Sequence, residues 1–94
     1  GNQVIKLTAQ FTNQSTLMIT YMDLSGKSRL VEMDVSTSSK TFNQRSYVVK
    51  ANKTHSETYS INVSNASKVT IMLYPHTSTK PNSGYIGPYK AILQ

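Results

Sequence analysis

The chain has 94 residues, a formal net charge of +6 and no cysteine. Its length predicts one domain spanning residues 1–94, and the lack of cysteine excludes thiolate zinc sites, iron–sulfur clusters and a cysteine nucleophile. Ser and Thr account for 24 residues, and only 15% of the chain is charged, against an average of about 25%. This composition favours a secreted, periplasmic or cell-surface protein whose signal peptide has been removed.

Apolar residues alternate with polar ones along much of the chain, a period of two that is typical of half-buried β-strands. The alternating segments are 5–11, 17–21, 31–35, 59–63 and 69–73. Two further short strands are predicted at 47–49 and 89–93. We therefore predict an all-β fold, a small antiparallel β-sandwich of about seven strands with an immunoglobulin-like or meander topology. A small barrel is the alternative.

Turn chemistry predicts how some of these strands connect. The loop 24–26 ends in Gly26, a residue that suits the left-handed position of a three-residue hairpin loop. In the hairpin predicted here, Ile19 would pair with Val31, so that apolar side chains meet on one face. A second hairpin is predicted around 65–67, and it would pair the last two alternating segments.

Residues that support catalysis or metal binding are few. His55 and His76 are the only histidines, and neither lies in a nucleophile-elbow or triad-like pattern. Glu32 and Asp34 are two apart on one predicted strand and so share a face, where a solvated sheet surface is the simpler interpretation. We predict no catalytic residues, no metal, no cofactor and no enzymatic activity. Four Asn-X-Ser/Thr sequons leave glycosylation open.

The segment Pro75–Pro88 is rich in Pro, Gly and Tyr, which predicts an irregular loop. Tyrosine provides broad, rigid contact area and is common in recognition loops. The alternative is that Tyr85 and Ile86 fold back and cap the end of the sandwich. The candidate ligand-binding residues are Tyr74, His76, Tyr85 and Tyr89.

The segment from Val35 to Ser56 contains basic residues and no acid. Such a field favours an anionic partner, either an anionic glycan or a protein. Alternatively, the charge only keeps the domain soluble and protects strand edges. The candidate anion-binding residues are Lys40, Arg45, Lys50 and Lys53. The aromatic residues among them match no RNA-binding signature, so nucleic acid is not the predicted partner.

Three apolar side chains, Met18, Met22 and Leu30, are out of phase with the main stripe. On the predicted hairpin they would form a second apolar face, which indicates a homo-oligomer or contact with a neighbouring domain. No apolar run approaches the length of about 18 residues that spans a membrane. The leading hypothesis is an exported, non-enzymatic binding or adhesion-type domain at a cell envelope or surface. The alternative is a structural or assembly domain that packs through this sheet face.

Overall fold

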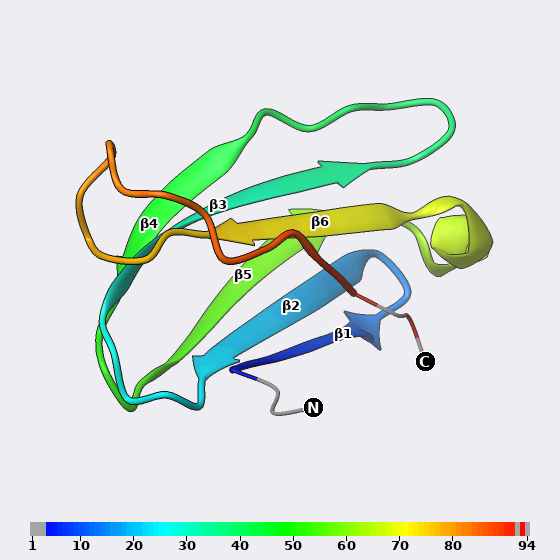
Figure 1. The fold of residues 1–94 in the computed structure, drawn as a ribbon. Coiled ribbons are helices and arrows are strands. Elements are labelled where there is room, and N and C mark those ends of the chain that lie inside the picture. Colours follow the sequence, from blue (N-terminus) through cyan, green and yellow to red (C-terminus); the bar gives the residue numbers. More distant parts are fainter. Residues whose placement is uncertain (1–3, 92, 94) are drawn as a thin grey trace.

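The computed structural model describes residues 4–91 and residue 93. It contains seven strands and one short 3₁₀ helix (Figure 1). In chain order the elements are β1 (Ile5–Asn13), β2 (Thr16–Asp23), β3 (Arg29–Ser36), β4 (Arg45–Val49), β5 (Thr54–Ser60), η1 (Val63–Lys68), β6 (Thr70–Pro75) and β7 (Tyr89–Lys90).

The strands form two antiparallel sheets that pack face to face. One sheet has the order β1-β2-β5 and the other the order β4-β3-β6-β7 (Figure 1). The chain changes sheet between β2 and β3, between β4 and β5, and between β5 and β6, as in the Greek-key connections of immunoglobulin-like sandwiches. The predicted β-sandwich is therefore confirmed. The meander and small-barrel alternatives are wrong for the described residues, which form two separate sheets and no closed barrel.

The core lies between the sheets and is built by the predicted alternation. In β2 and β3 every second residue is buried and the residues between are partly exposed. Leu17 and Leu73 have no exposed surface at all. Leu7 and Phe11 of β1 are partly buried against this core. Each buried side chain of this size stabilises the folded state by about 1.5–3 kcal/mol. Because such side chains come from both sheets, their burial holds the two sheets together.

The predicted hairpin across loop 24–26 is wrong. Its two strands, β2 and β3, belong to different sheets, so Ile19 and Val31 are buried in the core from opposite sheets and do not pair. Apolar patterning alone does not separate these arrangements, because both bring apolar faces together. Gly26 nevertheless has the predicted left-handed conformation, with φ of 77°.

The second predicted hairpin, around 65–67, is also wrong, since β5 and β6 lie in different sheets as well. The chain crosses between them through η1. Asn62 caps this helix, its side chain accepting a hydrogen bond from the Ser64 backbone N–H at 2.9 Å. Val63, predicted as a strand residue, is 43% exposed at the start of η1. The Asn cap was the sequence signal that competed with strand alternation.

One glycine near the end of the β6–β7 connection is fixed by close packing. A Cβ at Gly87 would lie 2.9 Å from the Leu73 carbonyl oxygen and 3.0 Å from the Pro75 ring. At Gly84, in the same connection, a Cβ would have no other atom within 4 Å. The two positions therefore differ in how much room they leave for a side chain.

We expect Gly87→Ala to lower the free energy of unfolding by about 1–3 kcal/mol, because backbone atoms must shift to admit the methyl group. Gly84→Ala is the matched control and should change it by less than about 0.5 kcal/mol. Urea denaturation measures both. Equal effects would contradict the packing described at Gly87.

Candidate functional site

Three connections meet at one end of the sandwich: loop 24–28, turn 50–53 and loop 76–88 (Figure 1). Direct contacts hold them together. The Ala51 backbone N–H donates to the Ser28 hydroxyl at 2.9 Å, which joins the first loop to the turn. Two backbone hydrogen bonds join loop 76–88 to Leu30 at the start of β3. The His76 N–H donates to the Leu30 carbonyl at 2.8 Å, and the Leu30 N–H donates to the Ser78 carbonyl at 2.9 Å.

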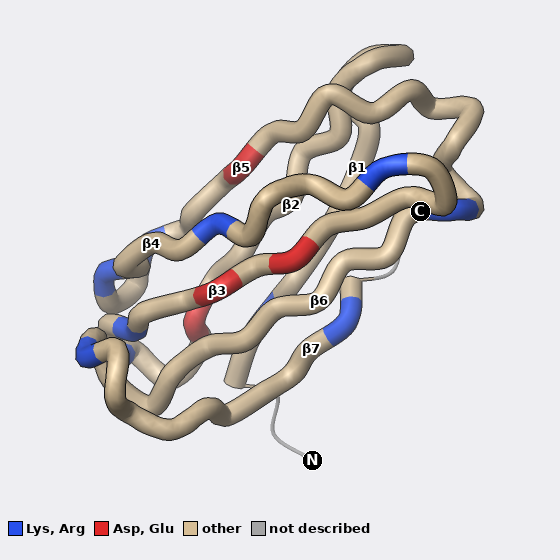
Figure 2. Tube along the Cα trace, turned by 90° about the horizontal axis from the view of Figure 1, so that it is seen from above, with Lys and Arg blue, Asp and Glu red and all other residues tan. Residues whose placement is uncertain are grey.

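This end carries a concentration of positive charge, and we call it the lysine end. It is defined by four exposed side chains, Lys27, Lys50, Lys53 and Lys80. None of the four forms an ion pair within the described part of the chain. Figure 2 shows basic residues gathered at this end. Positive charge therefore remains available to an incoming anion.

One acid beside these loops is neutralised inside the protein. Asp23, at the end of β2, forms a buried ion pair with Arg29, at the start of β3, and their side chains are only 1% and 6% exposed. Asp23 also accepts hydrogen bonds from the backbone and hydroxyl of Ser25, at 2.8 and 2.5 Å. Burial alone would raise the pKa of the Asp23 carboxyl, but the bonds from Ser25 and Arg29 outweigh it and lower that pKa.

A second polar cluster surrounds His76, immediately after β6. Its Nε2 lies 2.7 Å from Glu32 Oε2, and its Nδ1 lies 2.9 Å from the Ser83 carbonyl oxygen. The Tyr85 hydroxyl donates to the same Glu32 oxygen. Hydrogen bonds from Tyr85 and His76 lower the pKa of the Glu32 carboxyl. The cluster thus holds the base of loop 76–88 against the outer face of β3.

The structure brings together three of the four predicted ligand-binding residues. Tyr85 packs edge-on against Tyr74, with ring centroids 6.2 Å apart, and lies 4.3 Å from the His76 ring. Tyr85 is 55% exposed, so it does not cap the core. Tyr89 lies elsewhere. It pairs with Leu73 on the inner face of the sheet and packs against the core.

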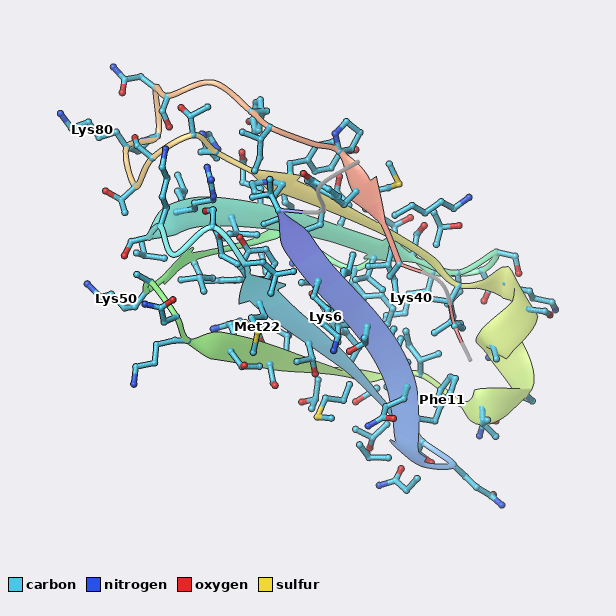
Figure 3. The ribbon with its side chains drawn as sticks, turned by 60° about the horizontal axis from the view of Figure 1, so that its bottom comes forward. Lys6, Phe11, Met22, Lys40, Lys50 and Lys80 are labelled. Carbon is cyan, nitrogen blue, oxygen red and sulfur yellow. The ribbon has the colours of Figure 1, made fainter. Side chains whose placement is uncertain are left out.

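The structure does not bring the predicted anion-binding residues together. Lys50 and Lys53 belong to the lysine end, whereas Lys40 lies in the β3–β4 connection, away from Lys50 and Lys80 (Figure 3). Arg45, at the start of β4, pairs with Met33 in the middle of β3. It donates to Glu57 at 3.2 Å, and its guanidinium lies 3.9 Å from the ring centroid of Tyr59.

The other histidine belongs to the seam between β4 and β5. His55 stacks on Tyr47, with ring centroids 3.9 Å apart, and its Nε2 lies 3.2 Å from Glu57 Oε1. These contacts join β4 and β5, which are edge strands of the two different sheets. They link His55 to core packing and to the carboxylate that also receives Arg45.

The predicted apolar interface does not form as one face. Met18 and Met22 lie on the outer face of the three-stranded sheet, where Met22 pairs with Lys6 (Figure 3). Leu30 lies on the outer face of the other sheet and pairs with Val48. The prediction that the three side chains sit together was wrong because it depended on the hairpin between β2 and β3.

A groove of about 530 Å³ lies at the far end, over β3. Its lining includes Asp34, Phe42, Gln44 and Met72 and none of the lysines. Phe42 packs edge-on against Tyr59, with ring centroids 5.4 Å apart, so its ring is committed to the core. This groove is separate from the lysine end.

Sequence reasoning missed two members of the lysine end, Lys27 and Lys80, and the role of Glu32. Lysine is common on surfaces, and only the order of strands reveals which loops converge. The pairing of Glu32 with His76 joins residues 44 apart in the sequence. The proximity of Glu32 to Tyr74 follows from the register of β3 against β6, in which the two are direct partners.

No group of three or more potential metal-ligating His, Cys, Asp or Glu side chains occurs among residues 4–91 and 93. Within the same residues, no helix has the length and apolar character needed to cross a membrane. No protein-family model, curated protein or solved structure matches the chain. The functional assignment therefore rests on the geometry of the molecule.

Proposed function

We propose that this chain is a non-enzymatic binding domain that is exported to a cell envelope or surface, and that its lysine end binds an anionic partner. The observation that carries the proposal is the convergence of Lys27, Lys50, Lys53 and Lys80 on three loops that contact one another or the start of β3. The hydroxyl-rich, charge-poor composition supports export.

Charge distribution supports this partner class. All eight lysines in the chain are exposed, whereas both arginines are engaged in ion pairs with acids. Glu32 and Glu57 are engaged by histidines. Exposed carboxylates therefore offset little of the positive field, and that field accelerates and strengthens encounters with anions at low salt. Anionic glycans fit best, because a polyanion can contact several separated lysines at once.

The geometry around the histidines favours binding over catalysis. His76 is 3% exposed, and both of its ring nitrogens face protein acceptors. The Ser83 hydroxyl lies 3.4 Å from His76 Nδ1, but it donates to the Lys80 carbonyl at 2.6 Å. A base that activates a nucleophile needs a free ring nitrogen directed at that nucleophile and at substrate. The Nδ1 of His76 lies closer to the Ser83 carbonyl oxygen, at 2.9 Å, and its Nε2 faces Glu32, so neither nitrogen is free for that role.

The test is binding of heparin, a sulfated polysaccharide, by isothermal titration calorimetry at low and at physiological ionic strength. We expect affinity to fall steeply with salt. Lys50→Gln/Lys53→Gln should weaken binding about 3- to 10-fold, since each exposed charge contributes up to about 1 kcal/mol.

The control is Lys40→Gln/Lys68→Gln, which removes the same charge at the far end. It should change heparin affinity by less than about twofold. Equal losses in the two double variants would show that binding follows net charge and would overturn the assignment to the lysine end. Affinity that is flat in salt, or no heparin binding, would overturn the anionic partner.

A further inference from the structure

The imidazole of His76 is a buried ring placed between two acceptors. Nδ1 lies 2.9 Å from the Ser83 carbonyl oxygen, and Nε2 lies 2.7 Å from Glu32 Oε2. A carbonyl oxygen and an ionised carboxylate can only accept hydrogen bonds. A neutral imidazole has one N–H, so it would leave one of these contacts as two facing lone pairs. The doubly protonated imidazolium satisfies both contacts.

Glu32 provides the matching negative charge. Its Oε2 accepts from the Tyr85 hydroxyl as well as from His76. These two donors lower the pKa of the Glu32 carboxyl, so it is ionised at neutral pH. A buried cation is tolerated when it is paired and hydrogen-bonded, and the imidazolium has both a charged partner and a carbonyl acceptor.

The same contacts fix the segment that carries Lys80. Residues 76 and 85 form a β-bridge, and the Thr77 N–H donates to the Gly84 carbonyl at 2.7 Å. Residues 77–84, which include Lys80, therefore form a loop that is closed at its base, and we call this loop the 76–85 excursion. Behind the ring, Arg29 donates to the His76 carbonyl at 3.0 Å, which ties this backbone to the buried ion pair with Asp23.

We propose that His76, held as an imidazolium between Glu32 and the Ser83 carbonyl, is a positioning residue that fixes the 76–85 excursion and so keeps Lys80 in the lysine end. We call the contacts of His76 with Glu32 and the Ser83 carbonyl the latch. The effect of the latch on anion binding rests on the proposed function, whereas the latch itself does not. Loss of either of its two hydrogen bonds would loosen the excursion.

The charged and titratable groups that surround the ring come from every neighbouring element. Glu32 and Arg29 face it from β3, and Tyr74 lies nearby on β6. Tyr85 faces it from the loop, and Asp23 of β2 acts through Arg29.

The experiment uses the intact chain without ligand. The ¹⁵N shifts of the His76 ring report whether both nitrogens carry protons, and amide hydrogen exchange of residues 77–84 reports opening of the excursion. We expect both ring nitrogens to carry protons, because each faces an acceptor, and the excursion to open rarely. Exchange rates are corrected for intrinsic chemistry.

Glu32→Gln should increase opening about tenfold, because the charged partner of the ring is gone. Asp34→Asn is the matched control on the same face of β3 and should leave opening unchanged. Tyr85→Phe removes only a hydroxyl from an exposed ring, so it keeps the test open if Glu32→Gln folds poorly. It should increase opening by a smaller factor.

A singly protonated ring at neutral pH, or opening that is unchanged in Glu32→Gln and Tyr85→Phe, would overturn the latch. Heparin titration of the same variants separates this result from the proposed function. Loosened variants with weaker heparin binding support both proposals. A confirmed latch in a protein that does not bind heparin would leave the latch standing and remove the function. If the latch is confirmed but the loosened variants bind heparin as tightly as the original protein, the positioning role of the latch would be overturned.

Discussion

Replacing Arg29 with Leu is expected to lower the free energy of unfolding by about 3–5 kcal/mol, because it leaves the Asp23 carboxylate buried without its counter-ion. The substitution also removes the donors to the His76 carbonyl and to the Ser25 hydroxyl, at 3.0 and 3.2 Å. Domains of this size are commonly stable by only about 5–15 kcal/mol. Urea denaturation should therefore show a large shift of the midpoint.

Arg45→Leu is the control for this prediction, since Arg45 also pairs with a carboxylate but has a side chain that is 40% exposed. Solvent screens such a pair, so its loss should cost about 1 kcal/mol or less. The double variant Asp23→Leu/Arg29→Leu should recover part of the loss of the single variant, because no uncompensated charge remains. A loss below about 1 kcal/mol in Arg29→Leu would contradict the burial of this pair.

The inward-facing residues could be predicted from the sequence because alternation has a direct physical cause. Successive side chains of a strand point to opposite faces, so Leu17, Ile19 and Tyr21 had to share one face. The partner strand did not follow from the same pattern. An apolar face is satisfied equally by a neighbour in its own sheet and by the opposing sheet, and β2 meets β3 in the second way.

The candidate site was predictable only in part for the same reason. The tyrosines and His76 of the 74–89 region are visible as local composition, and three of the four candidates do lie together. The lysine end depends on which loops share one end, and that is a property of strand order. Interpreting Lys40 and Lys50 as one basic stretch failed because β4 and part of the β3–β4 connection lie between them.

Polar burial connects the fold to the proposed binding surface. Asp23 and Arg29 stand where β2 ends and β3 begins, and Arg29 reaches the backbone of His76. From His76 the contacts continue to Glu32 and Tyr85 on the outer face. A single chain of charged hydrogen bonds thus runs from the sandwich interior to the loop that carries Lys80. Asp23, Arg29 and His76 shape the surface although they are themselves buried, so substitutions among them should alter loop order and binding together.

Replacing Leu17 with Ala is expected to lower the free energy of unfolding by about 2–5 kcal/mol, since the side chain has no exposed surface and its removal leaves a cavity between the sheets. Met18→Ala, one residue further along β2, is the control. Met18 points to the outer face between Gln10 and Thr58 and is only partly buried. Its truncation should cost about 1 kcal/mol or less in a monomer, as measured by urea denaturation.

The same pair of variants also decides between the two functional alternatives for the three-stranded sheet. If its outer face is bathed in solvent, only the Leu17 variant loses much stability, and the stability of both variants is independent of protein concentration. If a second copy covers this face, Met18→Ala should approach the cost of the core variant and the unfolding midpoint should rise with protein concentration, because association stabilises by mass action. We expect the first result, since Leu30 lies on the opposite sheet and hydroxyl side chains surround the two methionines.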